Sequence, residues 1–82
     1  MNTTETLDTA LEAARKGRGL TYAELGDALG CSEMSAWRYC LPPGDRNHRE
    51  PRDREVRKRL KDRFGLTVDT FAEPARPKRR KP

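Results

Sequence analysis

The sequence has few of the residues on which small enzymes and secreted domains depend. Its 82 residues include two cysteines, one histidine, one tryptophan, two tyrosines and two phenylalanines, and only 33% are hydrophobic. No nucleophile has a neighbouring base, no glycine-rich loop could hold a phosphate, and no acidic cluster could bind a metal. These absences argue against an enzyme and against a bound cofactor, and they leave binding as the function to look for.

The two cysteines, Cys31 and Cys40, flank one predicted helix and are too far apart for a disulfide, which needs Cα atoms within about 7 Å. We therefore predict reduced thiols and a cytoplasmic protein. We expect Cys31, in a turn facing the core, to be the less reactive thiol. A zinc site completed by His48 is the alternative, but three ligands at irregular spacing match no zinc pattern. The chain also lacks a basic-then-apolar signal segment and a run of membrane-spanning length.

The net charge of +5 is concentrated at the C-terminal end. Residues 74–82 contain five of the 18 bases and no acid, which leaves 13 bases against 13 acids in residues 1–73. We predict one folded domain over residues 1–73 and a disordered basic tail over residues 74–82, which lack large apolar side chains. Such a tail favours a polyanionic partner. The alternative is that it only keeps the protein in solution.

Apolar residues recur at helical spacing along the folded part, and strand-like alternation is absent. We predict an all-α fold, a compact five-helix bundle. The helices are expected from Thr3 or Thr4 to Lys16, from Thr21 to Leu29, from Ser32 to Cys40, over residues 51–63 with Pro51 in the first turn, and over residues 68–71 after a cap at Thr67. Thr21 and Glu24 have capping-box spacing, and Ser32 is a good helix cap. Leu25, Leu29, Leu60 and Phe64 are expected to pack together in the core.

The third predicted helix raises a question, because it turns a small residue inward and the largest apolar one outward. Ala36 lies on the face of Tyr39 and Cys40. The opposite face carries Glu33, Met34, Trp37 and Arg38. Small residues at Gly26 and Ala36 would let the second and third helices cross closely. An exposed tryptophan then indicates a face with a partner, although Trp37 could instead pack on the following loop or the fourth helix.

The segment LTYAELGDALGCSEMSAWRYC, residues 20–40, places two short helices around a glycine-containing turn, which is the helix-turn-helix pattern. It resembles the helix-turn-helix of the phage repressor and Cro superfamily, also called xenobiotic-response-element-like regulators. FGLTVDTFAEP, residues 64–74, resembles the family's helix-four exit and short helix five, and the likeness covers residues 4–73. The chain departs from the family at Ala36, where a branched aliphatic is usual, and in the long basic loop PPGDRNHREP, residues 42–51.

The resemblance implies that the third helix enters the major groove of double-stranded DNA and reads bases with Glu33, Met34, Trp37 and Arg38. Arg38 suits guanine, Glu33 suits the amino group of cytosine, and Met34 and Trp37 suit thymine methyl groups or sugar. Phosphate contacts are expected from Thr21, Tyr22, Ser32, Arg46, Asn47, Arg49, Arg52, Lys78, Arg79, Arg80 and Lys81. The other cations of the fourth helix are better explained as a solvated face, because acids are interleaved with them.

These features predict a sequence-specific DNA-binding transcriptional regulator, a small repressor of phage or mobile-element type. We expect it to bind a palindromic operator as a homodimer, with pairing that the DNA itself can impose. The alternative is a protein-interaction module, such as an antitoxin or anti-repressor, that keeps the fold without reading an operator. An RNA-binding role for the tail is a third possibility, since the fold alone does not decide the function.

Overall fold

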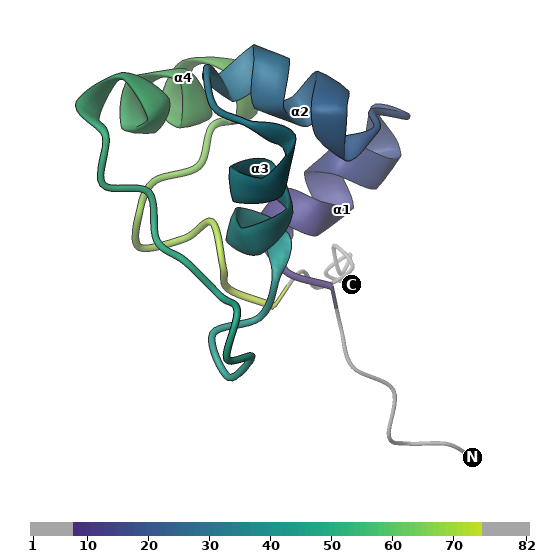
Figure 1. The fold of residues 1–82 in the computed structure, drawn as a ribbon, viewed down its shortest axis with the longest axis vertical. Helices are drawn as coiled ribbons and strands as arrows, with labels where there is room; N and C mark the ends of the chain where they lie inside the picture. Colours follow the sequence, from purple (N-terminus) through teal and green to yellow (C-terminus); the bar gives the residue numbers. More distant parts are fainter. Residues whose placement is uncertain (1–7, 75–82) are drawn as a thin grey trace, which may run out of the picture.

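The computed structural model describes residues 8–74 of the chain, and its regular structure consists of four α-helices. They are α1 (Ala10–Gly17), α2 (Tyr22–Leu29), α3 (Glu33–Cys40) and α4 (Arg54–Phe64). In Figure 1, α2 and α4 lie at one end of the molecule, and the loop after α3 extends towards the opposite end. An isolated bridge between Thr9 and Pro74 joins the two ends of the described chain. The all-α class is confirmed.

The expected count of five helices is wrong, because the segment after α4 forms only a turn. The backbone N–H of Phe71 donates to the carbonyl of Thr67 at 2.9 Å, and the next backbone bond, from the N–H of Glu73 to the carbonyl of Thr70 at 3.2 Å, spans only three residues. The carbonyls of Phe71 and Glu73 instead accept from Leu11 and Ala10, at 3.0 and 2.8 Å. Pro74 has no N–H with which to extend a helix. The last carbonyls of the segment therefore accept from the free N–H groups at the start of α1 instead of taking part in a helix of their own.

Two helices also begin later than the sequence suggested. The backbone of Thr9 is extended, and its Oγ1 accepts from the N–H of Glu12, so α1 starts after Thr9 rather than after Thr3 or Thr4. Residues 1–7 lie outside the described residues. Asp53 caps α4 in the same way, through Glu55, whereas the buried Pro51 precedes the helix. In each stretch several residues could act as a cap, and the side chains that accept the first free N–H groups are those of Thr9 and Asp53.

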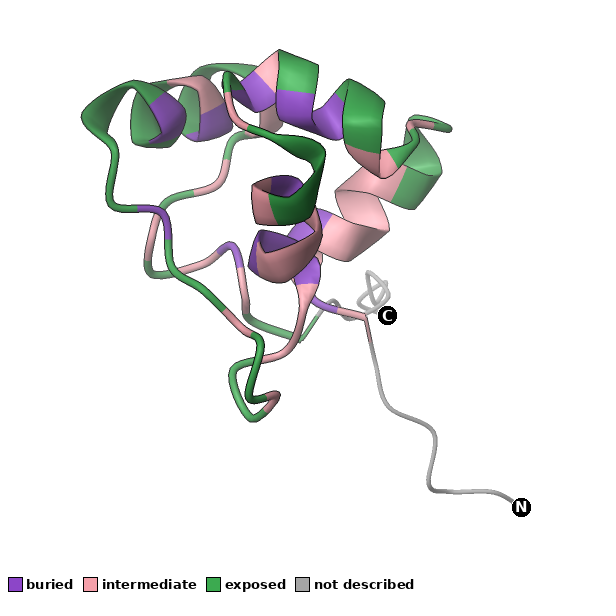
Figure 2. Cartoon of the chain, in the orientation of Figure 1, coloured by how far each residue is buried: buried purple, intermediate pink, exposed green. Residues whose placement is uncertain are grey.

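The core lies where the inner faces of all four helices meet, at the positions drawn purple in Figure 2. The expected burial of Leu25, Leu29 and Leu60 is confirmed, with 0 to 1% of each exposed. Phe64 is half-buried but packs against this core, and the guanidinium of Arg18 lies 4.5 Å from the centre of its ring. The buried apolar residues are Leu11, Leu25, Leu29, Ala36, Tyr39, Cys40, Val56, Leu60 and Phe71.

The connection between α2 and α3 depends on two glycines. Gly30 ends α2 in the left-handed region at φ 80°, a conformation in which other residues are strained. The N–H groups of Gly30 and Cys31 both donate to the carbonyl of Gly26, at 2.7 and 2.8 Å. A Cβ on Gly26 would lie 2.7 Å from the carbonyl oxygen of Cys31 and 3.0 Å from that of Ser32. Gly26 therefore makes room for the turn itself, and the fully buried Ala36 makes room for the helix crossing.

Both cysteines are free thiols, and their burial reverses the expected order of reactivity. Cys40 is 4% exposed at the end of α3, whereas Cys31 is only half-buried. Burial raises the pKa of both thiols, and the nearby Glu12 carboxylate raises the pKa of Cys40 further. Because the thiolate is the reactive species, Cys40 is the less reactive of the two.

We expect Gly26→Ala to lower the free energy of unfolding by about 1–3 kcal/mol, because the new methyl group forces the turn away from α2. Gly17→Ala is the matched control, since a Cβ there would meet nothing within 4 Å. It should leave stability unchanged or raise it by up to about 1 kcal/mol. Urea denaturation of the two variants measures the difference. Equal stabilities would show that α2 does not approach the turn this closely.

Labelling of the native protein with a thiol reagent should proceed in two phases. We expect Cys31 to react quickly and Cys40 to react only at the rate at which the protein opens. Cys31→Ser should abolish the fast phase and Cys40→Ser the slow one. A Cys40 that reacts as fast as Cys31 would contradict the packing of the end of α3 against α1.

Candidate nucleic-acid interface

The outward face of α3 carries the four residues that the sequence assigned to base reading. Ser32 caps the helix, and its Oγ accepts from the N–H of Ser35 at 3.1 Å. Glu33 is exposed and Met34 is 55% exposed, whereas Ala36 on the inner side is fully buried. Trp37 and Arg38 are half-buried on the outer side. The helix therefore presents one acid, one base and two large apolar groups to its surroundings.

Three of these residues share a shallow hollow with the start of α2. Its lining residues are Tyr22, Glu33, Met34 and Trp37. Trp37 does not belong to the half-buried hydrophobic residues that pack on the core within residues 8–74. The hollow thus has an apolar wall from α3 and an aromatic wall from α2, and the half-buried Trp37 forms part of the apolar wall.

Arg38 lies at the other edge of this face, where the long loop returns to α3. The N–H groups of Leu41 and Arg49 both donate to its carbonyl at 3.3 Å. Within the described part of the chain, its Nε is the only buried side-chain polar atom that has no hydrogen-bond partner. A guanidinium whose terminal nitrogens make no hydrogen bond within residues 8–74 retains the fork that a carboxylate, phosphate or guanine edge requires.

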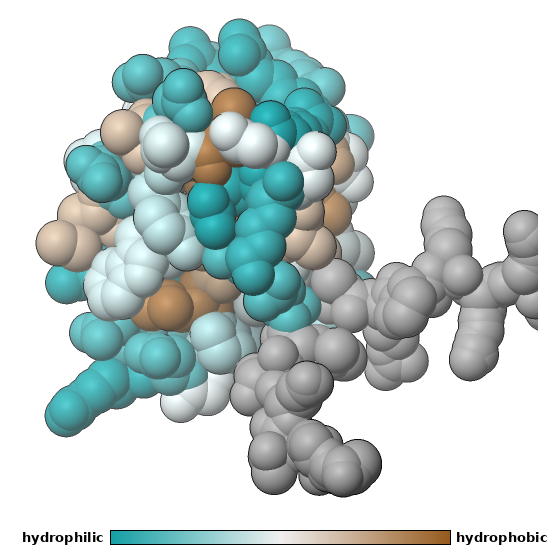
Figure 3. All heavy atoms as spheres, turned by 90° about the vertical axis from the view of Figure 1, so that its right-hand side faces the viewer, coloured by the Kyte–Doolittle hydropathy of each residue, from teal (hydrophilic) through white to brown (hydrophobic). Residues whose placement is uncertain are grey.

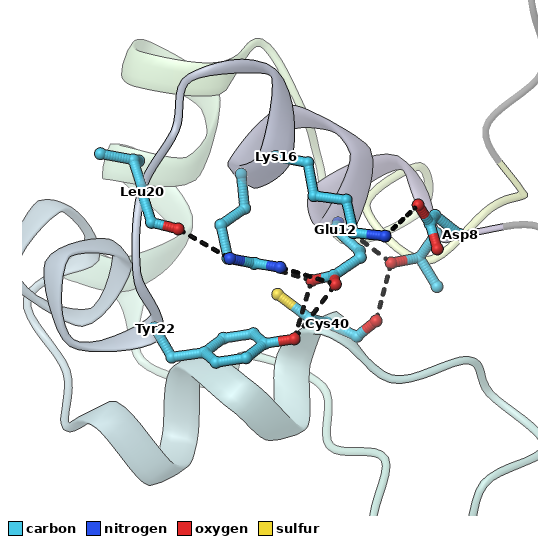
Figure 4. Close-up of polar contacts among 8 residues, drawn as sticks. Asp8, Glu12, Lys16, Leu20, Tyr22 and Cys40 are labelled. Atoms are coloured by element: carbon cyan, nitrogen blue, oxygen red, sulfur yellow. Dashed lines mark hydrogen bonds and ion pairs between the residues drawn. The ribbon is translucent and has the colours of Figure 1, made fainter.

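A polar network under α1 fixes the start of α2 (Figure 4). Two nitrogens of Arg15 each donate to a different oxygen of Glu12 at 2.9 Å, and a third donates to the carbonyl of Leu20 at 2.7 Å. The hydroxyl of Tyr22 donates to the same carboxylate, at 3.1 and 3.2 Å to its two oxygens. The Arg15 guanidinium also lies 4.2 Å from the centre of the Tyr22 ring. These contacts hold one wall of the hollow in place.

Charge and burial in this network shift three pKa values. Hydrogen bonds from Arg15 are the main reason that the pKa of Glu12 is lowered, and they outweigh the opposing effect of burial. The same pairing raises the pKa of Arg15. Burial and the Glu12 carboxylate raise the pKa of Tyr22, so its hydroxyl remains a proton donor. Glu12 and Arg15 were missed in the sequence, although their i, i+3 spacing is typical of helix ion pairs.

The far end of α3 is held by a buried hydrogen bond. The Oγ1 of Thr9, which is 2% exposed, donates to the carbonyl of Cys40 at 2.8 Å. Beyond it, Nδ1 of His48 lies 2.8 Å from the carbonyl of Leu41, and the His48 ring stacks on Phe71 with centroids 5.8 Å apart. The loop is therefore fixed to the body of the domain on both sides.

The residues assigned to phosphate binding lie in three places. Thr21 and Ser32 cap α2 and α3, so their side-chain oxygens already accept backbone N–H groups. The Tyr22 hydroxyl is engaged by Glu12, which leaves its backbone N–H at the start of α2. The side chains of the long loop and of the segment before α4 are exposed: Arg46, Asn47, Arg49 and Arg52. Lys78, Arg79, Arg80 and Lys81 lie outside the described residues.

The cations of α4 differ in their contacts. Arg57 donates to the carbonyl of Pro51 at 3.0 Å, and Arg59 pairs with Glu55 at 3.2 Å. The guanidinium of Arg59 also lies over the turn at Gly30. A Cβ placed on Gly30 would be 2.8 Å from it. The remaining charged residues of α4 are exposed. These contacts support the interpretation of α4 as a solvated face.

The side on which α1 lies in Figure 1 is mainly hydrophilic, and its apolar atoms form small separate areas (Figure 3). Residues 8–74 contain no group of three or more side chains that could hold a metal ion. Over the same range, no helix combines the length and hydrophobicity needed to cross a bilayer.

Comparisons of the chain with protein-family models, with curated proteins and with solved structures give no match. The arrangement of α2, the turn and α3 is therefore the basis for any functional inference.

We expect Glu12→Gln to lower the free energy of unfolding by about 1–3 kcal/mol at pH 7, because it leaves the half-buried Arg15 without its partner. The lowered pKa of Glu12 means that the carboxylate stabilises the fold above its unfolded pKa of about 4.3. This contribution is lost as the pH falls through the lower folded value. In urea denaturation, the difference in free energy of unfolding between the parent and Glu12→Gln should therefore be smaller at pH 3 than at pH 7.

Glu50→Gln is the matched control, because Glu50 is exposed in the loop. Its effect should be within about 0.5 kcal/mol of zero at both pH values. A Glu12→Gln variant as stable as Glu50→Gln at pH 7 would show that the network does not hold α1 to α2.

Proposed function

We propose that the chain is a sequence-specific DNA-binding transcriptional regulator that reads the major groove with α3. The observation that carries this proposal is the orientation of α3, which buries Ala36 against the core and turns Glu33, Met34, Trp37 and Arg38 outward. A helix of this kind, packed across a second helix through a tight glycine turn, suits the docking of its outer face in a groove.

The chemistry of the exposed groups supports DNA over a protein partner. The fork of Arg38 suits the O6 and N7 atoms of guanine, and the carboxylate of Glu33 suits the amino group of cytosine. Arg46, Arg49 and Arg52 are exposed on the segment between α3 and α4, where phosphate oxygens can be neutralised. Asn47 and the backbone N–H groups that begin α2 supply neutral donors to the same phosphates.

A palindromic operator would engage two copies of the chain, with their α3 helices about one helical turn of DNA apart. Pairing imposed by the DNA requires no large preformed interface between the copies. Because a protein bound at an operator blocks access to that site, we assign the chain as a small repressor of phage or mobile-element type that works in the cytoplasm.

We expect Arg38→Ala to weaken operator binding by about 1–3 kcal/mol and to leave binding to a scrambled duplex nearly unchanged. Arg38 contacts base edges in this proposal, and a base contact contributes to affinity only on the correct sequence. Titrations of both duplexes at several salt concentrations measure the two affinities. Arg63→Ala, which removes a cation of the same kind from the exposed face of α4, is the matched control and should not change their ratio.

Truncation after Pro74 should weaken both duplexes alike, because the five tail cations add affinity without sequence preference. It should also reduce the slope of log K against log salt concentration by up to about 0.9 for each lost phosphate contact. An unchanged slope would favour a tail that serves only solubility. If Arg38→Ala weakens both duplexes equally, or no operator is selected from random DNA, the protein-interaction module becomes the better assignment.

A further inference from the structure

We propose that the hollow beside α3 reads a cytosine that carries a 5-methyl group, so that DNA methylation raises the affinity of the protein for its site. This inference rests on the proposed function and specifies the base that one part of the interface takes. Three features carry it: the apolar wall formed by Met34 and Trp37, the aromatic wall formed by Tyr22, and the carboxylate of Glu33 in the same lining.

The two kinds of group in the hollow match two neighbouring atoms of one base. In the major groove, cytosine presents its N4 amino group as a donor, and C5 is the adjacent ring position. Glu33 is exposed, and an ionised carboxylate can only accept. A carboxylate that accepts from N4 therefore sets the C5 substituent beside the neighbouring apolar wall of Met34 and Trp37.

The same arrangement discriminates between the two bases that carry a 5-methyl group. Thymine has the methyl group of 5-methylcytosine but presents an acceptor, O4, where the modified cytosine presents its amino group. Thymine would place two acceptors against each other at Glu33. Unmethylated cytosine satisfies Glu33 but leaves the hollow without the methyl group. Among the bases that can stand at this one position, 5-methylcytosine is the one that offers both a donor to the carboxylate and a methyl group to the apolar wall.

The hollow is built to keep its shape when a base enters. Tyr22 is held by Glu12 and Arg15, and α3 is capped by Ser32 at one end and held by Thr9 at the other. Met34 is 55% exposed, so its side chain is available to a ligand at little cost to the core. An apolar wall gains affinity from each methyl group that it removes from water.

The test uses two libraries of random duplex DNA, one made with cytosine and one with 5-methylcytosine. The full-length protein selects a site from each, and single cytosines of that site are then exchanged for 5-methylcytosine or, opposite adenine, for thymine. At one position of each half-site, we expect methylation to tighten binding about fourfold, which corresponds to the burial of one methyl group. Thymine at that position should bind about tenfold or more weakly than 5-methylcytosine.

Three variants separate the parts of the hollow. Met34→Ala should reduce the methylation effect while the exposed position keeps the protein folded, and a melting temperature checks the fold. Glu33→Gln should reduce the discrimination between thymine and 5-methylcytosine, because an amide also donates. Glu50→Gln, an exposed acid in the loop, should leave both effects intact.

The outcomes distinguish this inference from the function on which it rests. A selected site that binds equally well with cytosine and 5-methylcytosine at every position overturns the inference and leaves the regulator intact. A methylation effect that is undiminished in Met34→Ala also overturns it, because the methyl group then lies elsewhere. If neither library yields a site, the proposed function fails, and the inference fails with it.

Discussion

The close approach of α2 to the turn that follows it is the constraint on which the rest of the structure depends. It is possible because Gly26 has no Cβ, and any other residue would place an atom 2.7 Å from the carbonyl oxygen of Cys31. The carbonyl of Gly26 accepts from the N–H groups of Gly30 and Cys31, so the chain turns within the three residues that separate α2 from α3. This turn orients α3 so that Ala36 is fully buried in the core, while Met34 on the opposite side is 55% exposed.

A second set of contacts holds the start of α2 and the end of α3 in place. The Glu12–Arg15 pair forms hydrogen bonds with the carbonyl of Leu20 and the hydroxyl of Tyr22, and Thr9 donates a hydrogen bond to the carbonyl at the end of α3. These contacts are half-buried or buried, and they involve charged groups that would be destabilising without their partners. The small domain therefore uses polar groups, as well as its nine buried apolar residues, to orient the helix that carries the candidate site.

The candidate interface combines charged and apolar side chains, and this combination narrows the kinds of partner that it suits. An apolar surface alone would suit many protein partners, and a basic surface alone would suit any polyanion. The outer face of α3 combines Glu33 with Met34 and Trp37, and it places Arg38 at its edge. The proposal of DNA binding rests on this combination of acceptor, donor and apolar groups, because base edges in the major groove carry groups of all three kinds.

The sequence by itself determined the features that depend on neighbouring residues. The bounds of α2 and α3 could be predicted because Thr21, Glu24, Gly30 and Ser32 are local signals, and the capping box that the first two form is present. Helical spacing also identified which side of α3 faces the core. In both cases the interaction spans only three or four residues, and the chain geometry fixes it without reference to the rest of the fold.

The tertiary structure decided everything that depends on residues far apart in the chain. Thr9 rather than an earlier threonine begins α1, because its hydroxyl reaches Cys40. The segment after Thr67 remains a turn, because the carbonyls of Phe71 and Glu73 are taken by the start of α1. The hollow likewise needs Tyr22 and Trp37, which meet only once α2 and α3 are packed. Local spacing assigns a residue to a face of its helix, but packing alone determines which faces meet.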